Sequence, residues 1–439
     1  MESQGSPLVE QQTPPAAPTV GEQEIAQGIE KVDIGQQQEA AIDNVNEEDL
    51  EEVQFENDIA PEESDGEDVE EELEVEEEEQ EGQAAVREKD NAFLAFDGHA
   101  DSVYCVALTK DGSRAVSGGG DDVGILWDAK TGSEIAKLKG HTDSVVDCSF
   151  NFDETLCATG SYDSTVRIWN GVTGEHVKTL EGPSSEVEWV RWHTKGNVVM
   201  AGSEDATTWV WDACSGNCLA VLAGHEAGVT CGLFTPNGKR AITGSQDGTV
   251  RMWDVRTSSC VHTFSGHDWH EGDVTTVVCH PTEPMIAAGG ADGTVRVARL
   301  ETKRVVASFN HGRSGEDDEE MTAVESAAFS PVASWLASGG ADGSIKIWDL
   351  KTQSCRAVLE HGGTVVKMVF VPNTPLLISC SIDGSCYIWD TRSGKKLGLV
   401  TMHEDMILFL DVQNNIVVTA GDDKVCRLAS IEEYVLSHK

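Results

Sequence analysis

The sequence predicts an all-β protein, an eight-bladed β-propeller that follows a disordered, acidic N-terminal arm. The first observation is a pattern of about forty residues that recurs from residue 91 to the end of the chain. The second is that each copy contains short apolar runs with the alternation of half-buried strands, separated by polar turns. The third is the composition of residues 1–90, which are rich in Gln, Glu, Pro and Ala and lack the apolar content of a packed core.

The N-terminal arm and the repeat region are both strongly acidic. The 439 residues have a formal net charge of −46, of which residues 1–90 carry −28 and the remainder −18. Such a charge repels DNA, RNA and anionic membranes. We therefore expect a basic protein or peptide as partner, no direct contact with nucleic acid and no contact with a membrane. We also expect a monomer in the cytoplasm, with the nucleus as a second location.

The residue types predict a binding protein and not an enzyme. The 12 cysteines form no CxxC pair, which favours reduced, buried thiols over a metal site or a disulfide framework. No nucleophile–base pair, phosphate loop or ligand cluster stands out, so we expect no cofactor and no metal. Residues 1–25 have no basic start and no apolar run, so no secretory signal is expected.

The acidic arm contains the most highly charged stretch of the chain. Residues 62–81 read EESDGEDVEEELEVEEEEQE, and self-repulsion should keep them disordered. Two interpretations stay open, a solubilising tail or an arm that gathers a basic partner, because composition does not separate them. Residues 49–57, DLEEVQFEN, are a candidate docking motif.

From residue 91 the copies align on three positions. The opening positions, which usually follow glycine, are His99, His141, Pro183, His225, His267 or His270, His311, His361 and His403. The closing positions, at the end of the third apolar run, are Trp127, Trp169, Trp211, Trp253, Ala298, Trp348, Trp389 and Ala429. Each has an aspartate six residues earlier, namely Asp121, Asp163, Asp205, Asp247, Asp292, Asp342, Asp383 and Asp423. Because this turn residue is present eight times, every copy is expected to form its third hairpin.

A period near forty that begins with Gly-His and ends with Trp-Asp resembles the WD40 repeat family. The resemblance implies a hydrogen-bonded tetrad of His, Ser or Thr, Asp and Trp in each blade, with a structural and not a catalytic role. Complete tetrads are expected in five copies: His99, Ser117, Asp121 and Trp127; His141, Thr159, Asp163 and Trp169; His225, Thr243, Asp247 and Trp253; His311, Ser338, Asp342 and Trp348; His361, Ser379, Asp383 and Trp389. The other copies depart from the pattern at Pro183, Ala201, Ala288, Ala298 and Ala429.

In this family the strand before each Gly-His is the outer strand of the preceding blade. The resemblance therefore implies that residues 91–96, NAFLAF, form an outer strand at the front of the domain. We expect this strand to pair beside the strand that ends near Ala429 and to close the ring, which removes exposed sheet edges. The predicted domains are an arm over 1–90, a propeller over 91–432 with 91–97 as the closing strand, and a C-terminal tail over 433–439.

The direction of the strands assigns the loops to two faces, and the charges segregate between them. The Gly-His loops and the aspartate turns share what we call the top face, and the other loops share the bottom face. The bottom loops hold Lys110, Arg114, Lys130, Lys195, Lys239, Arg240, Arg256, Lys303, Arg304, Lys351, Arg392, Lys395 and Lys396. Beyond the turn aspartates, the top loops hold Asp97, Asp101, Asp122, Asp143, Glu181, Glu186, Glu188, Glu204, Glu226, Glu271, Asp273, Glu325, Glu404, Asp405 and Asp422. Arg313 and Lys424 are the clear bases there.

The top face is the candidate surface for a basic partner. Two of its loops are enlarged: residues 267–273, HDWHEGD, whose indole we expect to be exposed, and residues 311–322, HGRSGEDDEEMT. Aromatic rings beside carboxylates suit the side chains of Arg and Lys. The expected binding residues are Tyr104, Tyr162, Glu186, Glu188, Trp189, Glu204, Trp269, Asp273, Glu325 and Asp422.

Within WD40 proteins, residues 185–218 and 236–254, the acidic arm and the degenerate third and fifth copies are similar to the angio-associated migratory cell protein family. The fungal counterpart in that family is a dedicated chaperone. The resemblance implies that this chain holds the basic N-terminal segment of a newly made large-subunit ribosomal protein (L-ten, or uL-sixteen, family) on its top face, for ribosome assembly. One alternative is a substrate receptor of a cullin-RING ubiquitin ligase, because WDVR (253–256) and WDTR (389–392) resemble the Trp-Asp-x-Arg box. Another is a histone-binding or signalling scaffold linked to cell migration.

Overall fold

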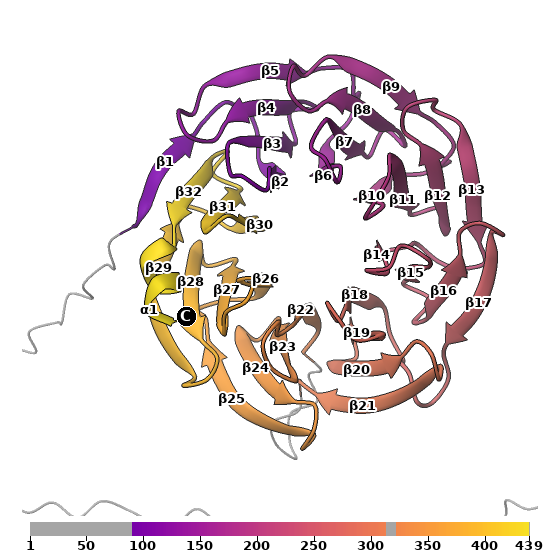
Figure 1. Ribbon diagram of the computed structural model, residues 1–439, viewed down its shortest axis with the longest axis vertical. Coiled ribbons are helices and arrows are strands. Elements are labelled where there is room, and N and C mark those ends of the chain that lie inside the picture. The colour runs from indigo at the N-terminus through magenta and orange to yellow at the C-terminus, as the bar shows by residue number, and fades with distance from the viewer. Residues whose placement is uncertain (1–89, 313–321, 439) are drawn as a thin grey trace, which may run out of the picture. The chain divides into compact units, whose positions relative to one another are not determined.

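The computed structural model describes residues 90–312 and 322–438, and these residues form an eight-bladed β-propeller (Figure 1). Each blade is a four-stranded antiparallel sheet, and the eight sheets surround a central channel. The prediction of eight blades is therefore confirmed. The predicted disordered arm and the acidic insert at 316–320 lie outside the described residues.

The strands occupy four positions from the channel outward. The first strands are β2 (Val103–Leu108), β6 (Val145–Phe150), β10 (Val187–Trp192), β14 (Cys231–Phe234), β18 (Val274–Cys279), β22 (Val324–Phe329), β26 (Val365–Phe370) and β30 (Ile407–Gln413). The second strands are β3 (Arg114–Gly119), β7 (Leu156–Ser161), β11 (Val198–Ser203), β15 (Ala241–Gly244), β19 (Met285–Gly290), β23 (Trp335–Gly340), β27 (Leu376–Ser381) and β31 (Ile416–Gly421).

The third and fourth positions complete each blade. The third strands are β4 (Gly124–Asp128), β8 (Val166–Asn170), β12 (Thr207–Asp212), β16 (Val250–Asp254), β20 (Thr294–Arg299), β24 (Ser344–Asp349), β28 (Ser385–Asp390) and β32 (Cys426–Ser430). The outer strands are β5 (Glu134–Leu138), β9 (His176–Leu180), β13 (Cys218–Ala223), β17 (Ser259–Phe264), β21 (Arg304–Asn310), β25 (Ser354–Glu360), β29 (Lys395–Met402) and β1 (Ala92–Phe96).

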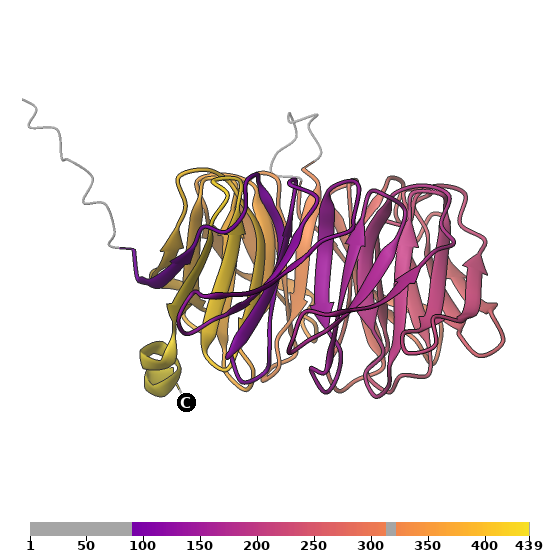
Figure 2. The same cartoon turned by 90° about the horizontal axis from the view of Figure 1, so that it is seen from above.

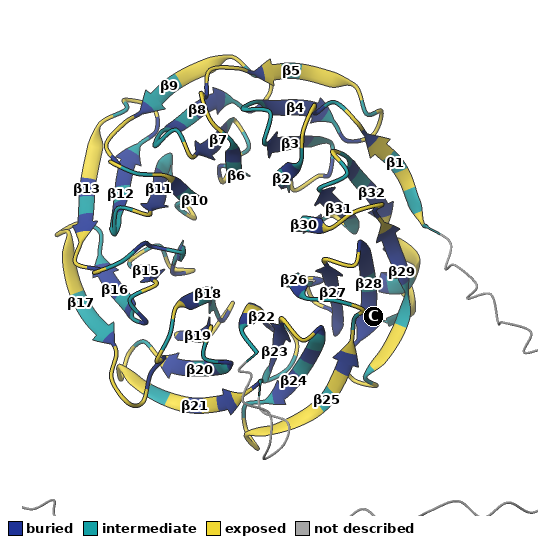
Figure 3. Ribbon diagram, turned by 180° about the vertical axis from the view of Figure 1, so that it is seen from behind, coloured by how far each residue is buried: buried dark blue, intermediate teal, exposed yellow. Residues whose placement is uncertain are grey.

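The burial of a strand follows its position in the blade. Second strands are covered on both faces by neighbouring blades, so β19 and β27 are buried at every residue. Outer strands have solvent on one side, so β5 and β13 keep several exposed residues (Figure 3). The hydrophobic core is consequently divided into clusters that lie between adjacent blades. This arrangement explains why second strands are buried along their whole length, whereas outer strands keep exposed residues.

The ring closes through strands from the two ends of the propeller. β1 pairs antiparallel with β32, with Ala92 opposite Ala429, as the sequence places it. The side chain of Phe96 is 4% exposed, and its ring stacks on Trp127 of the first blade at a centroid distance of 4.4 Å. β1 therefore completes the eighth sheet and also packs against the first.

The C-terminal residues that the sequence assigns to a tail form the helix α1 (Glu432–His438). The amide of Val435 donates to the carbonyl of Ile431 at 3.0 Å, and both side chains are buried in the core cluster between the last two blades. Their spacing of four residues places them on one side of a helical turn. In Figure 2 this helix lies at the edge of the propeller near the C-terminus. No helix in the described part of the chain is long and apolar enough to cross a membrane.

Candidate functional site

Hydrogen-bonded tetrads inside the blades position the loops of the top face. In the second blade, His141 Nδ1 lies 2.8 Å from Asp163, and His141 Nε2 lies 2.8 Å from the Thr159 hydroxyl. The indole of Trp169 donates to the same hydroxyl at 2.9 Å. Equivalent contacts are made in the first and fourth blades by His99, Ser117, Asp121, Trp127, His225, Thr243, Asp247 and Trp253. These side chains are engaged with one another, which fits a structural role.

The carboxylate of Asp163 in the second blade is held in its ionised form. Burial alone would raise the pKa of Asp163, but hydrogen bonds from His141 and Thr165 outweigh it and place that pKa well below the ordinary range. The carboxylate also accepts a bond from the backbone amide of Thr142 in the Gly-His loop at 3.1 Å. The aspartate turn and the Gly-His loop of one blade are thereby tied together on the top face.

Three blades vary this arrangement. In the sixth blade His311 uses Nδ1 to bond Ser338 at 2.7 Å, and its Nε2 lies 3.6 Å from Asp342. In the seventh, His361 Nε2 and the Trp389 indole share the Ser379 hydroxyl, each at 2.7 Å, as in the second blade. The difference is at His361 Nδ1, which lies 3.3 Å from the Ser385 hydroxyl, and that hydroxyl donates to Asp383 at 2.5 Å. The eighth blade has Ala429 in place of the indole and keeps the contacts among His403, Thr419 and Asp423.

Acidification is expected to destabilise the propeller through its buried histidines. Burial lowers the pKa of His311 to about 4, and the nearby Asp342 only partly offsets this effect. The unfolded chain takes up this proton near pH 6.5, so the stabilisation is complete above that pH and declines as the pH falls toward 4. The expected decline is about 3 kcal/mol for this residue. Denaturant unfolding at several pH values between 7 and 4 measures it.

A matched pair of variants isolates the contribution of His311. In His311→Asn, the free energy of unfolding should depend less steeply on pH between 6.5 and 5 than in the parent chain. The exposed His267 provides the control, because His267→Asn should leave the slope unchanged. Equal slopes in the parent chain and His311→Asn would contradict the assignment.

The enlarged loop of the fifth blade corrects one prediction. Trp269, expected to be exposed, is 1% exposed. It stacks on Phe264 of the preceding blade's outer strand at a centroid distance of 5.0 Å, as Phe309 stacks on Trp348 at 4.8 Å in the next blade. Because the fifth blade has Ala298 at the usual indole position, Trp269 supplies from the loop the ring that the third strand lacks.

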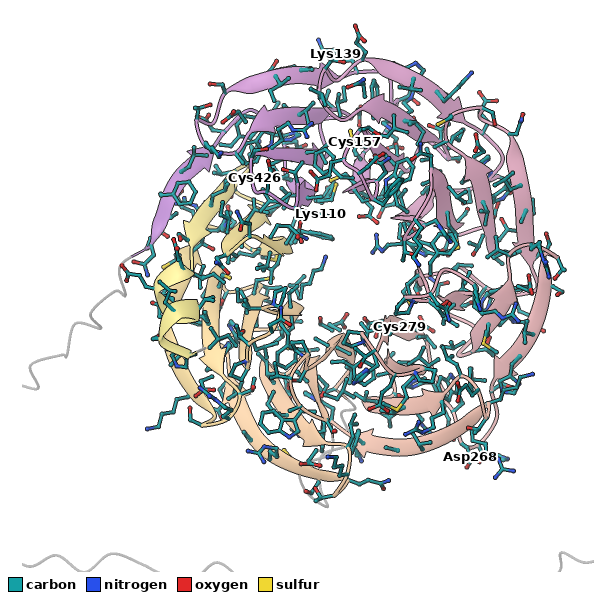
Figure 4. All side chains as sticks on the ribbon, in the orientation of Figure 1. Lys110, Lys139, Cys157, Asp268, Cys279 and Cys426 are labelled. Atoms are coloured by element: carbon teal, nitrogen blue, oxygen red, sulfur yellow. The ribbon has the colours of Figure 1, made fainter. Side chains whose placement is uncertain are left out.

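The same loop settles which histidine belongs to the fifth blade. His270 Nδ1 lies 3.0 Å from Asp292, whereas His267 is exposed. Asp268, which precedes Trp269, lies at the outer edge of the ring and away from the channel (Figure 4). The enlarged loop therefore extends the outer wall of the propeller. Trp269 is removed from the set of candidate binding residues.

Trp189 is also buried, which corrects a second prediction. Its indole is 3% exposed and donates to the carbonyl of Val229 at 2.8 Å. It occupies the space left by Gly202 in its own blade and Gly232 in the next, where an added Cβ would lie 2.3 and 2.2 Å from the ring. Trp189 therefore packs between the third and fourth blades and is not available to a partner.

The remaining candidate residues belong to a ring of equivalent positions around the top of the channel. In each blade, the amide of the residue before the turn aspartate donates to a loop carbonyl, at 2.8–3.1 Å. These two residues, and the residue two positions after that carbonyl, define what we call the rim. From the first blade to the eighth, the rim residues are Ser102, Tyr104 and Gly120; Ser144, Val146 and Tyr162; Glu186, Glu188 and Glu204; Gly228, Thr230 and Gln246; Asp273, Thr275 and Ala291; Ala323, Glu325 and Ala341; Thr364, Val366 and Ile382; Met406, Leu408 and Asp422.

Every charged residue of the rim is acidic. Its 24 residues, three from each of eight blades, include six carboxylates and two tyrosines but no lysine or arginine. The eight predicted binding residues other than Trp189 and Trp269 all belong to it. Lys424, beside the rim, donates to the carbonyl of Ala100 at 3.0 Å and lies 3.9 Å from Asp101.

The third blade holds the densest group of carboxylates. Partial burial raises the pKa of Glu188, and the negative charges of Glu204 and Glu186 raise it further. Glu186 and Glu204 are exposed, and the amide of Gln246 in the next blade donates to Glu204 at 3.3 Å. Three like charges at one place cost free energy in the unbound protein, so a cationic side chain placed among them is strongly favoured.

Below the rim, charged residues also face the channel. A cavity of about 640 Å³ is lined by residues of the first strands, among them Glu325, Val366 and Leu408. Deeper in it, Arg191 pairs with the buried Asp147. Lys110 points toward the channel from the bottom loop of the first blade (Figure 4). The described residues contain no group of three or more His, Cys, Asp or Glu placed to hold a metal ion.

Comparison with known proteins relates the fold to a family and to solved structures. The model of the WD domain, G-beta repeat (WD40) matches residues 92–128, 132–170, 174–212, 216–254, 258–297, 316–349 and 353–390. No curated protein matches the chain.

Among solved structures, Saccharomyces cerevisiae Sqt1 has a TM-score of 0.72 and 20% identity, over 78% of this chain and 99% of its own. Chaetomium thermophilum Sqt1 bound to the N-terminus of the ribosomal protein L10 has a TM-score of 0.70 and 24% identity, over 78% of this chain and 100% of its own. The computationally designed Ika8 protein has a TM-score of 0.67 and 25% identity, over 78% of this chain and 100% of its own. These similarities establish the propeller fold.

Proposed function

This chain belongs to the WD40 family, and we propose that it is a non-enzymatic chaperone of a basic ribosomal protein. Its top face would hold the basic N-terminal segment of a newly made protein of the L10 class in the cytoplasm until ribosome assembly. The observation that carries the proposal is the rim, with six carboxylates and no lysine or arginine among 24 residues. A structural neighbour, the Sqt1 of Chaetomium thermophilum, binds the N-terminus of L10.

The chemistry of the rim suits an extended basic segment. Arginine and lysine make charge-assisted hydrogen bonds to carboxylates, and the exposed ring of Tyr162 offers a face for a cation. Glu188 in the third blade and Glu325 in the sixth lie on different sides of the channel mouth. A segment laid over the channel can therefore meet both. Occupying its basic side chains would also keep them from nucleic acid before assembly.

Charge reversal on the rim is expected to abolish client binding. Glu188→Lys or Glu325→Lys should weaken binding of a peptide from the L10 N-terminus at least tenfold, about 1.4 kcal/mol, because attraction becomes repulsion. Neither residue belongs to a tetrad, so folding should be retained. Isothermal titration calorimetry of the full chain measures the effect, and Glu188→Gln should give an intermediate loss.

Lys239→Glu on the bottom face is the matched control and should leave binding unchanged. Lys396→Glu should also leave binding unchanged. It is the weaker control of the two, because Lys396 Nζ lies 4.2 Å from the centroid of the Tyr387 ring and its replacement also removes this packing contact. If the bottom-face variants abolish binding and the rim variants do not, the assignment of the face is wrong.

Salt should weaken the interaction, mainly by slowing association. Charges separated by more than a Debye length of about 8 Å are screened at physiological ionic strength, and steering of the client toward the rim is lost first. Stopped-flow or surface-based kinetics from low to high salt measure the association rate. An affinity that is the same at both extremes would contradict an electrostatic mechanism.

A further inference from the structure

The rim differs sharply in polarity from one side of the channel to the other. Its residues in the sixth, seventh and eighth blades include six apolar side chains, which we call the apolar arc: Ala323, Ala341, Val366, Ile382, Met406 and Leu408. Ile382 is 40% exposed and Met406 is 44% exposed. Large apolar side chains at the mouth of a binding surface favour a partner that covers them.

The apolar arc is continuous from blade to blade. The Thr364 hydroxyl of the seventh blade donates to the carbonyl of Ala341 in the sixth at 2.9 Å. The turn that follows Ile382 packs on the loop before Met406, because a Cβ added to Gly384 would lie 2.9 Å from the carbonyl oxygen of Asp405. Val366 and Leu408 continue the arc downward into the lining of the channel cavity.

The arc lies opposite the densest carboxylates of the rim. In a ring of eight blades the seventh stands across the channel from the third, as Figure 1 shows for the sheets of β26 and β10. Ile382 and Val366 therefore face Glu186, Glu188 and Glu204 over the channel mouth. Glu325, the carboxylate that lies within the arc, is an exposed residue, and partial desolvation by its neighbours raises its pKa.

We infer that the top face recognises an amphipathic basic segment, whose cationic side chains contact the third blade while its apolar side chains cover the arc of the sixth to eighth blades. This inference rests on the proposed function in that the partner is a basic peptide, and it adds the requirement for apolar side chains. Contacts of the two kinds respond differently to salt, because screening weakens charge pairs and leaves the hydrophobic effect in place.

Two synthetic peptides of equal length and equal positive charge test the requirement. One contains arginines separated by serines, and in the other two of the serines are replaced by leucines. The full chain should bind the arginine–leucine peptide at least fivefold more tightly, and this ratio should persist at high salt. Equal affinity for the two peptides would overturn the inference.

Variants of the chain locate the apolar contact. The double variant Ile382→Ser/Met406→Ser should remove the preference for the arginine–leucine peptide and leave binding of the arginine–serine peptide unchanged. Both side chains are exposed, so the melting temperature should not change. Val332→Ser, at a 50% exposed residue of a bottom loop, is the control and should preserve the preference. A preference that survives in the double variant would overturn the inference.

The L10 peptide separates this inference from the proposed function. If that peptide fails to bind while the arginine–leucine peptide binds through the arc, the proposed client is wrong and the amphipathic specificity stands. If the L10 peptide binds and Ile382→Ser/Met406→Ser does not weaken it, the client stands and the inference is overturned for that client.

Discussion

A chain that begins at residue 97 is expected to unfold at a temperature roughly 10 °C or more below that of a chain that begins at residue 90. The shorter chain lacks β1, so the third strand of the eighth blade becomes an exposed edge. It also loses the ring of Phe96 from its stack on Trp127, and the bond from Asn91 to the carbonyl of Leu399. Differential scanning calorimetry of the two chains measures the difference.

A single substitution tests the same contact without removing backbone pairing. Phe96→Ala should cost about 3–5 kcal/mol of the free energy of unfolding, because it opens a cavity between the eighth and first blades. Phe93 lies in the same strand and is 52% exposed, so Phe93→Ala should change stability by less than about 0.5 kcal/mol. Equal melting temperatures for the two truncations would show that β1 does not hold the ring closed.

Replacing Trp269 by alanine is expected to destabilise the protein by about 3–5 kcal/mol, although this residue lies in an inserted loop. The reason is that its indole is the ring on which Phe264 stacks, with Ala298 at the usual indole position behind it. Denaturant unfolding provides the measurement. The neighbouring and exposed His267 is the control, and His267→Ala should have little effect.

A compensating substitution makes this test more specific. In the Trp269→Ala chain, Ala298→Trp should recover part of the lost stability, because it restores the indole to the third strand. In the parent chain the same Ala298→Trp should destabilise, because the space is already filled. If it destabilised both chains to the same extent, Trp269 would not be the substitute for the missing ring.

The fifth blade also offers a stabilising substitution. His270 Nε2 and Trp269 Nε1 are buried and have no hydrogen-bond partner among the described residues. In the first, second, fourth and seventh blades the histidine Nε2 contacts a Ser or Thr hydroxyl, and the fifth blade has Ala288 at that position. Ala288→Ser should therefore stabilise the protein by about 1 kcal/mol, a typical net gain for one hydrogen bond. An unchanged or lower free energy of unfolding would show that the added hydroxyl does not reach the imidazole.

The sequence by itself determined the number of blades, the closing strand and the face of each loop. The blades can be counted because the aspartate turn is local: the Asp163 carboxylate binds the amide of Thr165, two residues away, at 2.9 Å. Because this contact forms within a single copy, it can be recognised from the sequence of that copy alone, without knowing which other segments pack against it. The assignment of loops to faces follows in the same way, since successive antiparallel strands must alternate in direction.

Only the tertiary structure decided which aromatic side chains are available to a partner. Trp189 and Trp269 look like surface residues because they flank top-face loops, yet Trp189 fills the space over Gly202 and Gly232, and Trp269 stacks on Phe264. Burial of a side chain depends on residues of other blades, which no local pattern specifies. The fifth copy has Ala298 in place of the usual indole, and the enlarged loop at its start contains an additional tryptophan. This coincidence is the sequence signal that could have identified the role of Trp269.

The division of the rim was likewise decided by closure of the ring. Glu188 and Ile382 are separated by almost two hundred residues in the sequence, and each is an ordinary loop or strand residue in its own copy. They face one another because eight blades of equal width place the third opposite the seventh. The sequence contained the charges and the apolar side chains, but their opposition across the channel exists only in the folded ring, where distance is set by packing and not by chain separation.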